Sequence, residues 1–76
     1  MNKEQHIELV FKRTNSDNEE TEYYQDIDDA RADFIYMSQE EPDEFQYAIL
    51  RLNTVDYDKH TEEIQVLENY TNIKYR

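Results

Sequence analysis

The sequence contains no glycine, no cysteine and no tryptophan, and only one proline. Without glycine, the chain cannot form the glycine-rich loops through which a backbone approaches a phosphate closely. The dinucleotide fingerprint, the P-loop and the nucleophile elbow of hydrolases are therefore excluded. The lack of cysteine excludes disulfides and fits a reducing compartment. Turns must be made by asparagine and aspartate, which tolerate left-handed backbone better than most residues.

Long apolar stretches are also missing. The first residues, MNKEQHIELVFKR, lack the apolar core of a signal peptide. No segment approaches the roughly 20 apolar residues of a membrane-spanning helix. We therefore expect a soluble, cytoplasmic protein that does not bind membranes. The length of 76 residues predicts a single acidic domain over positions 1–76.

High net charge with low hydropathy is also the signature of a disordered chain. Here the formal net charge is −11 and the mean hydropathy is −1.16. Against disorder, the apolar residues recur with strand and helix periods, and seven tyrosines and three phenylalanines supply large side chains to bury. The pattern favours a folded domain, and folding on a partner is the alternative.

The first third of the chain predicts a β-hairpin. In residues 5–13, Ile7, Leu9 and Phe11 alternate with polar positions, which indicates a half-buried strand. Residues 14–21 are polar and predict a loop, and residues 22–25 predict a short returning strand. The hairpin would therefore have a long tip.

A helix is predicted over residues 27–39. Asp26 and the acids after it resemble a capping box and suit the positive end of a helix dipole. An apolar stripe follows at spacings of three and four residues, formed by Ile27, Ala30, Phe34 and Met37. Pro42 ends the helix, because the residue before a proline is disfavoured in helical backbone.

The remaining residues predict two more strands. Residues 44–55 carry apolar side chains on both faces, with Ala48, Leu50 and Leu52 on one side and Phe45, Tyr47 and Ile49 on the other. This pattern is typical of a central strand. Residues 56–60 predict a turn and residues 61–72 a returning strand, with Ile64, Val66 and Tyr70 on one side and Leu67 on the other. The expected fold is α+β: an antiparallel sheet of about four strands (β-β-α-β-β) with one helix packed on a face.

The negative charge is concentrated in the middle of the chain. Residues 14–46 contain twelve acids and one base, which accounts for the whole net charge (12 − 1 = 11), and the other residues hold seven acids and seven bases. On a helix, Asp26, Asp29, Asp33, Tyr36 and Glu40 fall on one stripe. Carboxylates three or four residues apart lie about 5–6 Å from each other at Cβ and repel.

This charge predicts a non-enzymatic acidic binding module. Its hairpin tip, helix and helix exit would dock on the basic nucleic-acid-binding surface of a protein and block it, as DNA-mimic inhibitors and anti-defence proteins of mobile elements do as a class. We expect no direct binding to nucleic acid. Tyr36 is the candidate aromatic anchor. The predicted partner-binding residues are Asp26, Asp29, Asp33, Tyr36, Glu40, Glu41, Asp43, Glu44, Glu19, Glu20 and Glu22.

Three alternatives stay open. The acids could serve solubility alone, since charged residues are ordinarily solvated. The domain could self-associate as a homodimer through a sheet edge or exposed tyrosines, with the acids only keeping it soluble. It could also recruit a basic partner without inhibiting it.

Metal and catalytic chemistry find little support in the sequence. A calcium loop starting at Asp56 would need glycine at its sixth position and glutamate at its twelfth, where Thr61 and Leu67 stand. His6 and His60 are the only histidines, and nothing in the pattern places them together. Carboxylate pairs are abundant, but a thin two-layer domain is expected to offer little pocket volume for catalysis. We therefore expect neither an enzyme nor a cofactor.

Overall fold

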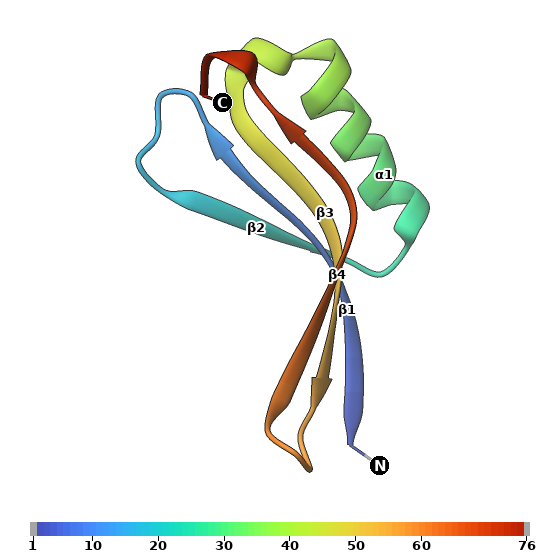
Figure 1. Cartoon of the computed structure of the whole chain (residues 1–76). Helices are drawn as coiled ribbons and strands as arrows, with labels where there is room; N and C mark the ends of the chain where they lie inside the picture. The colour runs from blue at the N-terminus through green and yellow to red at the C-terminus, as the bar shows by residue number, and fades with distance from the viewer. Residues whose placement is uncertain (1, 76) are drawn as a thin grey trace.

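A computed structural model describes residues 2–75, which form an α+β fold with the predicted element order. Strands β1 (Lys3–Arg13) and β2 (Glu19–Tyr24) precede helix α1 (Ile27–Ile35), and strands β3 (Phe45–Asp56) and β4 (Thr61–Thr71) follow it. The sheet is antiparallel throughout, in the order β2-β1-β3-β4. Helix α1 lies against one face of this sheet (Figure 1). The predicted fold class is confirmed.

The helix begins and ends where its sequence indicates. Asp26 is the N-cap, in extended backbone, and its carboxylate accepts a hydrogen bond of 2.8 Å from the backbone N–H of Asp28. After Ile35 the helical turns continue through a π-helical segment, Tyr36–Glu40. Pro42 then opens the short 3₁₀ turn Pro42–Glu44, so the prediction that the helix ends before Pro42 is confirmed.

The core lies between α1 and the two central strands. Leu9 of β1 is directly opposite Leu50 of β3, and Phe11 is opposite Ala48. All four side chains are buried, and they pack against Ala30, Phe34 and Met37 of the helical segment. The expectation that β3 is a central strand is confirmed, since it pairs with β1 on one side and β4 on the other.

Two side chains lie on the face opposite to the one predicted, and a register shift explains each. Gln46 has no partner in β1, because Lys12 pairs with Tyr47 and Arg13 with Phe45. This extra residue turns Phe45 into the core, away from the side of Tyr47 and Ile49. In the same way, an extra residue at Leu67 moves Tyr70 to the helix side, while Val66 stays on the other face.

The hairpin tip is also shorter than predicted. Strand β2 begins at Glu19, so the connecting loop comprises residues 14–18 rather than 14–21, and β2 ends at Tyr24 rather than continuing to Gln25. Acidic side chains are compatible with β2 because it is an edge strand with one side open to solvent.

A narrow part of the sheet, here called the stem, extends beyond the helix. It consists of Lys3–His6 of β1, Asn53–Asp56 of β3 and Thr61–Ile64 of β4, which pair in continuous register. Figure 1 shows it as the lower end of the molecule, with the β3–β4 turn at its tip. The molecule measures 42 × 25 × 17 Å along its principal axes. In the turn, His60 adopts left-handed backbone with φ of 54°, a position for which the sequence predicted an asparagine or an aspartate.

The sheet face away from α1, here called the open face, contains a buried ion pair. Glu8 is only 4 % exposed, and its carboxylate accepts hydrogen bonds from Arg51 Nε at 2.7 Å and from Asn53 Nδ2 at 3.3 Å. Val10, on the same face, is 1 % exposed. The open face is therefore partly packed rather than fully solvated.

The pairing of Glu8 with Arg51 leads to a stability prediction. Arg51→Leu leaves a buried carboxylate without its cation, and we expect it to lower the free energy of unfolding by about 3 kcal/mol in urea denaturation. The double variant Glu8→Leu/Arg51→Leu should recover most of this loss, because no buried charge is then left unpaired. If the double variant is as unstable as Arg51→Leu, the attraction between Glu8 and Arg51 stabilises the fold by more than the desolvation of the two charges costs.

Candidate functional site: an acidic surface on the helix and hairpin

The helix and β2 together surround Tyr24 with carboxylates. The Tyr24 hydroxyl donates a hydrogen bond of 2.5 Å to Asp33 Oδ2, which ties the flank of α1 to β2. Partial burial, this hydrogen bond, and the negative charges of Asp33, Glu22 and Asp29 raise the pKa of Tyr24. Glu22 of β2 and two acids of the predicted helical stripe therefore lie close to a single hydroxyl.

A second group of carboxylates surrounds Tyr36 at the helix exit. The Tyr36 hydroxyl donates a hydrogen bond of 3.3 Å to Glu41 Oε1. The charge of Glu41 is the main cause that raises the pKa of Tyr36, and the charges of Glu40 and Glu44 add to it. Tyr36 is 48 % exposed, so its ring lies at the surface among these three acids.

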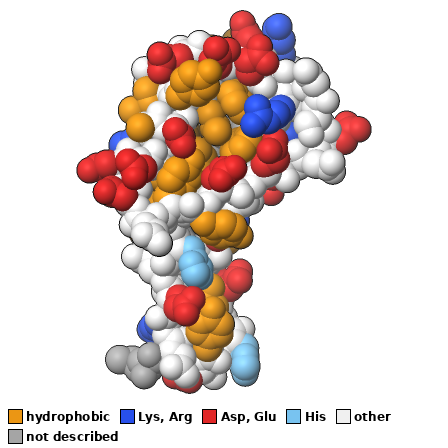
Figure 2. Space-filling model, turned by 180° about the vertical axis from the view of Figure 1, so that it is seen from behind, with side chains coloured by type: hydrophobic (Ala, Val, Ile, Leu, Met, Phe, Trp, Pro, Cys, Tyr) orange, Lys and Arg blue, Asp and Glu red, His pale blue; other side chains and the backbone are white. Residues whose placement is uncertain are grey.

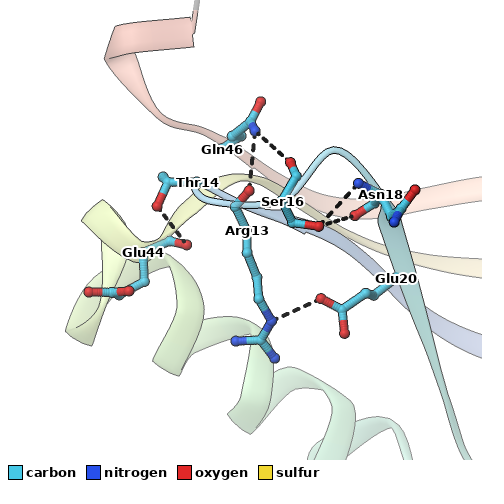
Figure 3. A network of polar contacts seen from close by, with 7 residues as sticks. All are labelled: Arg13, Thr14, Ser16, Asn18, Glu20, Glu44 and Gln46. Carbon is cyan, nitrogen blue, oxygen red and sulfur yellow. Dashed lines mark hydrogen bonds and ion pairs between the residues drawn. The ribbon is translucent and has the colours of Figure 1, made fainter.

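Backbone contacts bring the hairpin loop to the helix exit. The backbone N–H of Thr14 donates to the carbonyl of Glu44 at 3.0 Å. Gln46 Nε2 donates to the carbonyls of Arg13 at 3.1 Å and Ser16 at 3.4 Å, as Figure 3 shows. The extra residue in β3 therefore anchors the loop, and two acidic segments that are far apart in the sequence meet at this end of the sheet.

Arg13 lies where these segments meet. Its Nε donates to Glu20 Oε2 at 2.8 Å, and its guanidinium stacks over the rings of Phe11 and Phe45 at 5.5 and 5.6 Å. It also lines a shallow hollow of about 240 Å³ with Tyr36, Glu41, Glu44 and Phe45. Arg13 thus pairs with Glu20 of β2 and lies beside the carboxylates of the helix exit.

We call the resulting surface the acidic ridge. It comprises Glu20, Glu22, Asp26, Asp29, Asp33, Tyr36, Glu40, Glu41, Asp43 and Glu44. All of these residues are exposed except Glu20, which is half-buried. Asp26 lies at the start of α1 and Asp43 in the 3₁₀ turn after it.

Glu19 is the one predicted partner-binding residue that does not join the ridge. Side chains alternate between the two faces of a strand. Since β2 begins at Glu19, this residue faces the open face beside Lys12, while Glu20 and Glu22 face the helix side. Its carboxylate accepts a hydrogen bond from the Tyr47 hydroxyl. Glu19 was predicted as part of a loop, where no alternation applies.

The ridge keeps almost all of its charge. Among residues 2–75, Glu20 is the only acid of the segment 14–46 that forms an ion pair. Arg31, the single base of that segment, instead donates to Glu68 of β4 at 3.0 Å. Figure 2 shows red acidic side chains around exposed hydrophobic atoms over the broad end of the molecule, with few blue side chains among them.

Sequence reasoning missed Arg13 and Tyr24. Arg13 continues the alternation of Ile7, Leu9 and Phe11, so its position on the helix side could have been read from that pattern. The bond from Tyr24 to Asp33 has no such local signal, because it depends on how the helix crosses the sheet.

A hollow of about 610 Å³ on the open face is larger than expected for a two-layer domain. It is lined mostly by aromatic, aliphatic and amide side chains, including Tyr47, Ile49, Val66 and Tyr75. Its one carboxylate, Glu19, already accepts the Tyr47 hydroxyl. This lining does not present the two carboxylates with separate environments that acid–base catalysis requires.

The structure does not assemble the groups that a metal site would need from residues 2–75. His6 lies in β1 with its Nε2 3.5 Å from a Glu4 carboxylate oxygen, and His60 lies in the β3–β4 turn. Within this range, no three side chains of the metal-binding types are grouped to hold an ion. The same range contains no helix that is long and apolar enough to cross a membrane.

No family model, curated protein or solved structure matches this chain closely enough to assign it to a family. What the ridge can bind follows from its own charge and geometry.

The bond from Tyr24 to Asp33 can be tested by removing one oxygen atom. We expect Tyr24→Phe to lower the free energy of unfolding by about 1 kcal/mol, the usual loss for one hydrogen bond. Tyr23→Phe is the matched control, since the Tyr23 hydroxyl makes no hydrogen bond within the described residues. Equal urea midpoints for the two variants would contradict a stabilising role for the Tyr24 hydroxyl.

The bond from Tyr47 to Glu19 makes stability depend on alkaline pH. Partial burial and this hydrogen bond raise the pKa of Tyr47 from 10.0 to about 12. The folded state therefore holds the phenol proton more tightly than the unfolded state, and stability falls as the pH rises from 10.0 towards 12. Urea midpoints across this interval should fall less steeply for Tyr47→Phe than for the parent protein, and parallel curves would contradict the assignment.

Proposed function

We propose that this protein is a non-enzymatic, cytoplasmic binding module that docks its acidic ridge on the basic nucleic-acid-binding surface of another protein and blocks that surface. The supporting observation is the charge of the ridge: among residues 2–75, one ridge carboxylate, that of Glu20, has a basic partner. Carboxylates that carry no cation of their own are free to pair with the cations of a partner.

A basic nucleic-acid-binding surface suits this ridge for electrostatic reasons. Duplex DNA carries one negative charge per roughly 1.7 Å of its axis, and proteins that bind it present rows of lysine and arginine. The ridge presents carboxylates along α1 and across to β2, supported by a folded sheet. A partner that pairs with them gains electrostatic steering and displaces the cations that surround the carboxylates, as it displaces the cations that surround DNA. Anti-defence proteins of mobile elements are one class that acts in this way.

Tyr36 supplies the apolar contact that charge alone lacks. Its ring lies at the surface among Glu40, Glu41 and Glu44, and its hydroxyl is held by Glu41. Ile35, next to it, is also exposed. Aromatic residues within a polar rim are typical anchors of protein–protein interfaces. We therefore place the centre of the docking surface at the helix exit.

The proposal is tested first by identifying and challenging a partner. The immobilised protein is exposed at low salt to a lysate of the organism that carries the gene, and bound protein is eluted with salt. The eluted protein should bind labelled duplex DNA or RNA, and this protein should compete with that binding. A partner that binds nucleic acid equally well in its presence would contradict the blocking role. The protein alone should not bind the labelled nucleic acid.

Charge reversal locates the interface. We expect Asp29→Lys/Glu40→Lys to weaken partner binding at least tenfold in a titration, because two ridge carboxylates become repulsive. Neither side chain makes a hydrogen bond within residues 2–75, so the fold should survive, which circular dichroism would check. Glu62→Lys/Glu63→Lys is the control with the same change in net charge on the stem, and it should bind as the parent does. Equal losses in both variants would mean that net charge, rather than the ridge, determines binding.

A further inference from the structure

The outer edge of β4 is free along an unbroken stretch of strand. Residues Thr61–Val66 pair with Arg51–Asp56 of β3 on one side, and no other strand of the described chain lies on their far side. All six are exposed. The extra residue at Leu67 interrupts the register after them, so the regular edge ends there. The outward N–H and C=O groups of such an edge are ready to pair with another strand.

Two aliphatic side chains accompany this edge. Ile64 is 50 % exposed and Val66 is 52 % exposed, and both face the open face, opposite Asn53 and Arg51 of β3. Helix α1 covers the other face of the sheet, and about half of each of these two side chains remains in contact with water. A strand added beside β4 would place its own side chains next to them and remove them from water.

The charge of the edge selects the added strand. Strand β4 contains no lysine or arginine, and its exposed stretch carries Glu62 and Glu63. Neither glutamate has a side-chain hydrogen bond or ion pair within residues 2–75. In a pairing of β4 with β4 of a second copy, neither strand would offer a lysine or arginine to the glutamates of the other, so no favourable charge pair would form. A strand that carries lysine or arginine would instead gain two favourable pairs.

We propose that Thr61–Val66 of β4 is a strand-addition site that receives an extended basic segment of another protein as a fifth strand of the sheet. Basic side chains of the segment lie beside Glu62 and Glu63, and aliphatic ones beside Ile64 and Val66. Main-chain hydrogen bonds supply affinity and the side chains supply selectivity, as in other strand-addition complexes. The site begins on the stem and is separate from the acidic ridge, so it does not depend on the proposed function.

The test uses the synthetic peptide Val-Thr-Val-Lys-Lys-Thr, which in antiparallel pairing places its lysines beside Glu62 and Glu63 and its valines beside Ile64 and Val66. Its twin of equal charge is methylated on alternate backbone nitrogens and cannot pair as a strand. Both are titrated into the isotopically labelled full-length protein at physiological salt. We expect the unmethylated peptide to shift the amide resonances of residues 61–66 and to bind at least tenfold more tightly than its twin. Equal binding of the two, or shifts confined to residues 26–44, would overturn the proposal.

Two charge-matched variants separate this site from the ridge. Glu62→Lys/Glu63→Lys should abolish strand addition, whereas Asp29→Lys/Glu40→Lys should leave it unchanged and lose only binding to the partner of the ridge. Equal losses of peptide binding in both variants would overturn the proposal. Sedimentation of the protein without peptide should show a monomer, and a dimer abolished by Glu62→Lys/Glu63→Lys would identify a second copy as the occupant instead.

Discussion

Tyrosine hydroxyls donate hydrogen bonds to carboxylates at four places in the structure: Tyr24 to Asp33, Tyr36 to Glu41, Tyr47 to Glu19 and Tyr57 to Glu4. A lysine or arginine in the same position would hold the carboxylate and cancel its charge. A phenol holds it without cancelling the charge, because the donor is neutral. Two of these bonds, from Tyr24 to Asp33 and from Tyr36 to Glu41, belong to the ridge, and they order its carboxylates while leaving their negative charge uncancelled.

The repulsion within the ridge is balanced elsewhere in the molecule. Like charges three or four residues apart on a helix cost a few tenths of a kcal/mol per pair. The cap at Asp26 recovers part of this, and the packing of Ala30 and Phe34 on the central strands recovers more. The acids lie on the flank of α1 while the sheet supplies the core, so charge and packing do not compete for the same positions.

The sequence predicted the elements better than the faces. Apolar spacing was sufficient for α1, and alternation was sufficient for β1 and for the helix-facing half of β3, since these depend on local geometry. The ridge acids of α1 followed from the same spacing. The predicted faces of Phe45 and Tyr70 were wrong because each strand contains a single extra residue, which reverses the alternation of side chains between the two faces. A single sequence has no pattern that reveals such a residue. The same dependence on register decided that Glu19 would leave the ridge while Glu20 and Glu22 would join it.

The extra residue at Gln46 has a consequence for how the chain tolerates changes in length. It turns Phe45 into the core, and its amide ties down the loop that follows β1. Inserting one residue between Phe45 and Ala48 would turn Phe45 away from the core, because each added residue reverses the alternation of the side chains before it in the strand. The turn at Tyr57–His60 connects two paired strands at the tip of the molecule. It neither sets the orientation of a core side chain nor anchors another loop. Insertions introduced by evolution or by engineering should therefore accumulate at that tip, where a tag or a reporter can be placed at least cost to the core.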